Sequence, residues 1–189
     1  MNRLLVSILL LLIILSPAVF FAGCLPEEEE EVFDEAALVA VDNYIKDMAA
    51  ALSDSTLQAD LQGWSRDYYE DDEPPFYYDE ERREWLAEHK EELTALRQKH
   101  RKGSDFPSSE EVAGWEVIIV RGEQEWMLYG EEVIEALDLL EALFAEVIAV
   151  IDLIIANEGE LDEPKSERVL DLLDEIEPAV EEVRSIFFP

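Results

Sequence analysis

One stretch, residues 131–157, carries the strictest apolar pattern in the chain. Its apolar residues recur at alternating steps of four and three: Val133, Leu137, Leu140, Phe144, Val147, Ile151 and Ile154. Because this spacing places all of them on one side of an α-helix, it is typical of a seam in a helix bundle. The opposite side carries Ala142, Ala145 and Ala149. We expect another helix or a hairpin to approach closely there, and the second half of this helix to be central and buried.

Helical periodicity also predicts three further helices. The first covers residues 34–52, with a short continuation over 56–63. The second runs from Asp79 or Glu80 to about Lys102, and the last begins near Lys165 and meets Pro178, which is expected to kink or restart it. Four helices with short connections predict an all-α, mostly helical fold, arranged as an antiparallel four-helix bundle within a single domain over residues 34–189.

Between Val112 and Tyr129 the pattern becomes extended, with the runs GWEVIIV and EWMLYG on either side of RGEQ. Glycine followed by one residue suits a two-residue turn at Gly122-Glu123, which pairs Ile119 with Trp126 and Arg121 with Gln124. The sequence therefore predicts one inserted β-hairpin at about residues 115–129. Since an isolated hairpin is marginally stable in water, we expect it to lie against the helices.

The N-terminal segment has a different character. Arg3 is followed by a nearly continuous apolar run over residues 4–15 and then by SPAVFFAG, which is typical of a secretory signal. Its last four residues, Phe21-Ala22-Gly23-Cys24, resemble the lipobox of secreted lipoproteins. The resemblance implies a signal peptide over residues 1–23 that is cleaved before Cys24, and a lipid attached to that thiol. Residues 24–33 then form the attachment site and an acidic linker.

Two other interpretations of this segment stay open. Residues 4–22 form a nearly apolar stretch of nineteen residues, close to the roughly 20 that cross a bilayer, so the leader is alternatively an uncleaved anchor. A free structural cysteine is the third interpretation, although such residues are usually buried in a core. Cys24 is the only cysteine, so no internal disulfide stabilises the domain.

Charge limits the possible partners. The chain has 14 lysine and arginine residues against 47 aspartate and glutamate residues, a net charge of −33. A polyanion is repelled by such a field, which excludes nucleic acid as a partner. The five glutamates at 27–31 are expected to form a self-repelling spacer that holds the domain off anionic lipid. Adaptation to a salty exterior is an alternative source of the acidity.

Catalytic and metal-binding motifs are missing from the sequence. The two histidines, His89 and His100, lie eleven residues apart on one side of the second helix, about 16 Å along its axis, and cannot share one ion. No HExxH motif, calcium loop or nucleophile elbow occurs. We therefore expect no catalytic residues, no metal and no cofactor, and we expect both histidines to be satisfied by acidic neighbours, with a site across helices around His89 and Glu92 as the alternative.

The second helix concentrates basic residues in an acidic chain, with seven of them between Arg82 and Lys102. These side chains are expected to meet acidic neighbours within the fold, and a docking patch for an acidic protein is the alternative. Glu146 and Asp152 interrupt the most apolar stretch. Each is expected to face a narrow solvent strip or to pair with a basic residue of the second helix.

One constellation could bind a ligand, because aromatic faces beside carboxylates suit a cationic or sugar-like solute. Its possible binding residues, within residues 64–79, are Trp64, Tyr68, Tyr69, Asp71, Asp72, Tyr77 and Tyr78. The alternative is that the rings cover the end of the helices while the acids stay hydrated.

These observations predict a membrane-anchored surface lipoprotein, exported across the cytoplasmic membrane and held at its outer face by the lipid on Cys24. Its helical domain is expected to be a non-enzymatic interaction or accessory module for a protein partner at the cell surface. A small-ligand-binding lipoprotein that uses residues 64–79 is the alternative, and an uncleaved signal-anchor protein of the same topology is a more distant one. An enzyme is the least favoured class.

Overall fold

Helices dominate the residues that the structure, a computed structural model, describes: 35–65, 76–103, 105–121 and 124–187. The helices are α2 (Glu35–Leu52), α3 (Ser55–Gln62), α4 (Glu80–Arg101), α5 (Ser109–Ala113), α6 (Gly130–Ala156) and α7 (Glu163–Phe187). The strands are β1 (Trp64–Ser65), β2 (Phe76–Tyr77), β3 (Glu116–Arg121), β4 (Gln124–Tyr129) and β5 (Glu160–Leu161). The prediction of a mostly helical chain is therefore confirmed. The predicted signal peptide, Cys24 and the acidic linker lie outside the described residues.

The first predicted helix appears as α2, and its apolar face is buried as expected. The buried side chains are Ala37, Val41, Tyr44, Ile45, Met48, Ala49 and Leu52. The short continuation is a separate helix, because Asp54 has an extended backbone and caps α3: its side chain accepts hydrogen bonds from the amides of Thr56 and Leu57. A helix that starts afresh at Asp54 can turn its own apolar residues, Leu57 and Leu61, into the same core.

The seam predicted for residues 131–157 forms the core side of α6. Val133, Leu137, Leu140, Val147, Ile151 and Ile154 are buried, and Phe144 is half-buried. The expectation for the opposite stripe is wrong: Ala142 and Ala145 are exposed and Ala149 is half-buried, so no described element covers this side. The second half of α6 is buried on its core side, through Val147, Val150, Ile151 and Ile154, but not all round, because Ala145 and Ile155 are exposed. Among the described helices, none combines the length and the apolarity that crossing a bilayer requires.

The last predicted helix appears as α7, and Pro178 does not restart it. The helix is one element from Glu163 to Phe187 with Pro178 inside it. A proline removes one backbone hydrogen bond and crowds the preceding turn, but Pro178 lies on the exposed side, next to water. The core side of α7 consists of the buried residues Val169, Leu172, Ile176, Val180, Val183 and Phe187.

The strands β3 and β4 pair antiparallel, and Ile119 faces Trp126 while Arg121 faces Gln124, as predicted. A short helix that was not expected, α5, precedes them and starts with a capping box between Ser108 and Glu111. Gly130 at the start of α6 brings the two helices together, since its amide donates to the Trp115 carbonyl oxygen at 2.8 Å. A Cβ at Gly130 would lie 1.8 Å from the Val112 carbonyl oxygen.

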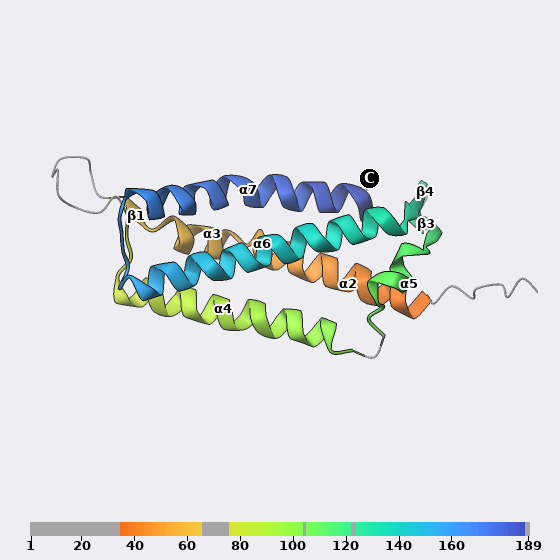
Figure 1. The fold of residues 1–189 in the computed structure, drawn as a ribbon, viewed down its shortest axis with the longest axis horizontal. Coiled ribbons are helices and arrows are strands. Elements are labelled where there is room, and N and C mark those ends of the chain that lie inside the picture. Colours follow the sequence, from red (N-terminus) through yellow and green to blue (C-terminus); the bar gives the residue numbers. More distant parts are fainter. Residues whose placement is uncertain (1–34, 66–75, 104, 122–123, 188–189) are drawn as a thin grey trace, which may run out of the picture. The chain divides into compact units, whose positions relative to one another are not determined.

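The long helices α2, α4, α6 and α7 pack around one shared core in the unit Asp34–Pro189 (Figure 1). Within this unit, Figure 1 shows the start of α2 and the β3–β4 pair at one end of the long axis. The strands β1, β2 and β5 form a small antiparallel sheet with β2 in its centre, at the opposite end. The described parts of the predicted ligand-binding segment, residues 64–65 and 76–79, therefore lie at the end away from β3 and β4.

Candidate functional site

Glu141 of α6 holds three helices together. Its carboxylate accepts a hydrogen bond from the Tyr44 hydroxyl of α2 at 2.5 Å and one from Arg97 Nε of α4 at 2.7 Å. Arg101 Nε and Nη2 donate to the same carboxylate at 3.0 and 2.9 Å. Burial alone would raise the pKa of Glu141, but these three donors outweigh burial and lower it. The arrangement is a clasp between α2, α4 and α6, in which every charge has a partner within the fold.

A second carboxylate, Asp60 of α3, is buried at 5% exposure. His89 Nε2 lies 3.2 Å from Asp60 Oδ2, and Arg82 Nε lies 3.8 Å from Asp60 Oδ1. Because a buried carboxylate is costly without partners, these two side chains of α4 explain how Asp60 is tolerated in the core. The sequence prediction did not include this cluster, since nothing in the local pattern distinguishes Asp60 from the exposed acids.

Both histidines pair with acids on other helices, as predicted. His89 faces Asp60, and His100 Nε2 lies 2.9 Å from Asp47 Oδ2. In the described part of the chain, no three side chains of histidine, cysteine, aspartate or glutamate are grouped closely enough to hold a metal ion. These pairs favour a structural role for the histidines over a role as ligands.

Glu146 and Asp152 are surface residues of α6. Asp152 pairs with Lys90 of α4, as one of the sequence interpretations expects. Glu146 differs, because its partner is Arg168 of α7, which donates from Nε at 2.6 Å and from Nη2 at 3.0 Å. The hydrogen bonds from Arg168 lower the pKa of Glu146. Both acids are therefore carboxylates that join α6 to a neighbouring helix through an ion pair.

The basic side chains of α4 are largely engaged within the fold. Arg82, Lys90, Arg97 and Arg101 all contact carboxylates of α3 or α6. Arg101 also lies over the rings of Tyr44 and Phe106, at 5.4 and 4.7 Å from their centroids. These contacts support the interpretation of α4 as a helix whose basic side chains meet acidic neighbours. The four cations do not form an open patch.

The predicted ligand-binding constellation is only partly described. Tyr68, Tyr69, Asp71 and Asp72 lie outside the described residues. Trp64 in β1 pairs through its backbone with Tyr77 in β2, which is half-buried. The possibility of a ligand site over residues 64–79 remains a prediction.

Tyr78 packs as a cover over the end of the helices. Its side chain is fully buried, its hydroxyl donates to the Leu61 carbonyl oxygen at 2.6 Å, and its amide donates to the Gly159 carbonyl oxygen at 2.9 Å. Burial raises the pKa of its phenol. The approach is close, since a Cβ at Gly159 would lie 2.1 Å from the Tyr78 carbonyl oxygen. Tyr78 therefore contributes to packing rather than offering an accessible ring.

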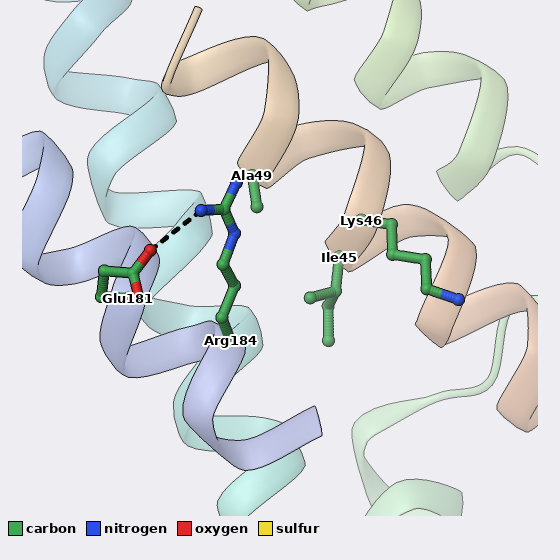
Figure 2. Close-up of a pocket in the computed structure, with 5 residues that line it drawn as sticks. All are labelled: Ile45, Lys46, Ala49, Glu181 and Arg184. Carbon is green, nitrogen blue, oxygen red and sulfur yellow. Dashed lines mark hydrogen bonds and ion pairs between the residues drawn. The ribbon is translucent and has the colours of Figure 1, made fainter. Parts of the chain in front are cut away.

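A shallow cavity of about 380 Å³ lies between α2 and α7 (Figure 2). Ile45, Lys46 and Ala49 of α2 line it, together with Glu181 and Arg184 of α7. Its charged groups are already paired: Arg184 donates to Glu181 at 2.9 Å, and Lys46 bonds Asp42. Figure 2 shows Lys46 extending away from Arg184 and Glu181. No set of polar groups converges in this cavity, as a specific ligand site requires.

The outer face of the β3–β4 pair exposes a group of large apolar side chains. Ile118, Val120, Met127 and Tyr129 are 54%, 65%, 41% and 48% exposed, and cross-strand pairing places them on one side. Eight large apolar side chains are strongly exposed in the described residues, and half of these eight lie on this face. The inner side instead contacts the core through Val117, Ile119 and Leu128. The sequence prediction did not single out this surface, which the alternation of side chains along the two strands could have located.

Comparisons of the chain with models of protein families, with curated proteins and with solved structures found no match.

Proposed function

We propose that this protein is a surface lipoprotein, anchored to the outer face of the cytoplasmic membrane through a lipid on Cys24. The observation that carries the proposal is the order of features at the N-terminus: Arg3, an apolar run, small residues and then the chain's only cysteine. That order resembles a leader that is cut before a lipidated cysteine. The glutamates at 27–31 then serve as a spacer between the lipid and the domain.

We further propose that the four long helices form an antiparallel four-helix bundle that carries β3 and β4 as an inserted hairpin. The ion pairs support this arrangement. Lys90 of α4 pairs with Asp152 of α6, and Arg97, further along α4, pairs with Glu141, which lies earlier in α6. The two helices therefore run antiparallel. The pairs Asp47–His100 and Asp60–His89 show in the same way that the α2–α3 segment runs antiparallel to α4. The bundle is consistent with the alternating direction that short connections favour.

The domain is proposed to act as a non-enzymatic interaction module for a protein at the cell surface. Two features support this role. The buried and half-buried charges at Glu141 and Asp60 are used to join helices, which is a structural task. The outer face of β3 and β4 is by contrast an exposed apolar surface, and such surfaces on monomers commonly mark interaction sites.

Metabolic labelling with a radioactive fatty acid tests the anchor. Wild-type protein in the native host is expected to incorporate label and to fractionate with the membrane. Cys24→Ser should lose the label, whereas a control substitution in the linker, Glu29→Ser, should retain it. Unlabelled wild-type protein in the membrane with the full leader still present would favour the uncleaved anchor. Wild-type protein without label in the cytosol would contradict the proposal altogether.

A further inference from the structure

The outer face of β3 and β4 has a defined chemical pattern. Strand pairing places Glu116 beside Tyr129, Ile118 beside Met127, and Val120 beside Glu125. Side chains that face each other across an antiparallel pair lie on the same side of the sheet. The face therefore has the Ile118–Met127 pair at its centre, a carboxylate at each of two diagonal corners, and Val120 and Tyr129 at the other two. Among the described residues of the two strands, Glu116 and Glu125 are the only charged side chains on this side.

The fold does not require apolar side chains on this outer face. The inner residues Val117, Ile119 and Leu128 already hold the pair against the core. A sheet with one face on the core usually places polar residues on the other, because water solvates them. Four large apolar side chains on the solvent side reduce solubility and call for a covering partner.

The charges on and around the face narrow the choice of partner. A second copy would bring Glu116 and Glu125 against an identical acidic face, in a chain of net charge −33, so like charges oppose self-association. Anionic lipid is opposed by the same field. A protein segment that offers apolar side chains flanked by lysine or arginine satisfies both the centre and the corners of the face.

We propose that the outer face of β3 and β4 is a docking surface for a basic, apolar protein segment. Ile118, Val120, Met127 and Tyr129 contact the apolar side chains of that segment, and Glu116 and Glu125 pair with its flanking cations. The inference rests on the proposed role as an interaction module and gives that role a surface and a partner chemistry. It does not depend on whether Cys24 carries a lipid.

The test uses the full chain, purified in a non-ionic detergent, and a synthetic peptide that alternates lysine and isoleucine over seven residues. A second peptide replaces each isoleucine by serine and so measures non-specific attraction to an acidic protein. The first peptide is expected to bind at least about tenfold more tightly, because only it can cover the apolar centre. Equal affinity of the two peptides would overturn the proposal.

Matched variants locate the binding. Ile118→Thr with Met127→Thr removes an exposed cross-strand pair while keeping strand-forming residues, and should weaken the lysine–isoleucine peptide about tenfold. Val39→Thr with Leu170→Gln removes two comparably exposed apolar side chains from α2 and α7 and should leave the affinity unchanged. Equal losses in the two variants would place the binding elsewhere and overturn the proposal. Circular dichroism establishes that each variant is folded.

A charge variant provides an independent readout that does not alter the apolar centre. Glu116→Gln with Glu125→Gln should reduce the affinity and its dependence on salt, whereas Glu175→Gln with Glu177→Gln, on the exposed side of α7, should change both only slightly. Two further outcomes would contradict the choice of partner. Sedimentation that shows dimers lost in the Ile118→Thr, Met127→Thr variant would assign the face to a second copy, and variant-sensitive binding to vesicles would assign it to lipid. Unmodified Cys24 in the same preparation would contradict only the lipid anchor.

Discussion

The Tyr44 hydroxyl of α2 donates a 2.5 Å hydrogen bond to Glu141 of α6, a residue 97 positions away in the sequence. The same carboxylate binds Arg97 and Arg101 of α4. Burial, and then the hydrogen bond to Glu141, raise the pKa of the Tyr44 phenol, so the hydroxyl stays protonated as a donor. A single acid thus links three helices that are distant in sequence.

Replacing this acid is expected to weaken the fold. Glu141→Gln keeps the shape of the side chain but removes the negative charge that faces two guanidinium groups, so the free energy of unfolding should fall by about 2 kcal/mol. Chemical denaturation followed by circular dichroism measures the change. Glu135→Gln, on the exposed side of the same helix, is the matched control and should have little effect. Equal effects of the two substitutions would show that the clasp contributes no special stability.

The pH dependence of stability should carry the signature of Glu141. Its folded-state pKa lies below the ordinary glutamate value of 4.5, so its stabilising contribution is present above that pH and is lost as the pH falls through the lowered folded-state pKa. Acidification also relieves repulsion in a chain of net charge −33, which acts in the opposite direction. The informative quantity is therefore the difference between wild type and Glu141→Gln. That difference should shrink below pH 4.5. A constant difference down to unfolding would contradict the assigned shift.

Tyr78→Phe tests whether the aromatic residues at the other end of the helices serve packing. The substitution removes the hydroxyl that donates to the Leu61 carbonyl oxygen and leaves that oxygen without this donor, at a cost of about 1–2 kcal/mol. Tyr129→Phe, on an exposed side chain, is the control and should leave the melting temperature unchanged. If Tyr78→Phe also leaves the melting temperature unchanged, the hydrogen bond to Leu61 does not contribute to stability.

Gly130→Ala tests the contact that positions the β3–β4 pair. The added Cβ would meet the Val112 carbonyl oxygen at 1.8 Å, so α5 must move, and the expected loss is about 1–3 kcal/mol. Gly114→Ala is the matched control, because its Cβ would meet its nearest neighbour, the Glu111 carbonyl oxygen, at an ordinary 3.8 Å. Thermal unfolding compares the two variants. Equal stability would show that α5 is free to shift without cost.

Much of the helical pattern could be read from the sequence because periodicity records which side of an element meets the core. The four-three spacing around Leu140 and the turn at Gly122-Glu123 predicted the core side of α6 and the register of β3 with β4. The short helix α5 was missed although Ser108 and Glu111 have the spacing of a capping box, which was the available signal.

Contacts between helices were harder to predict, because they depend on which helices are neighbours. Glu146 was expected to face a solvent strip or to pair with α4, and it instead pairs with Arg168 of α7. Asp60 resembles the exposed acids until α4 is placed beside it. Ala142 and Ala145 were expected to lie against another element, but they are exposed. Alanine favours helix formation as well as close packing, so its presence does not identify a buried side.

The central claim is that the chain is processed before Cys24 and carries lipid on that sulfur. Intact mass spectrometry of the protein isolated from membranes of its native host tests this claim most directly. We expect a species that begins at Cys24 and is heavier than residues 24–189 by the mass of a diacylglycerol group, with or without a further acyl chain. An unmodified chain running from Met1 to Pro189 would contradict it.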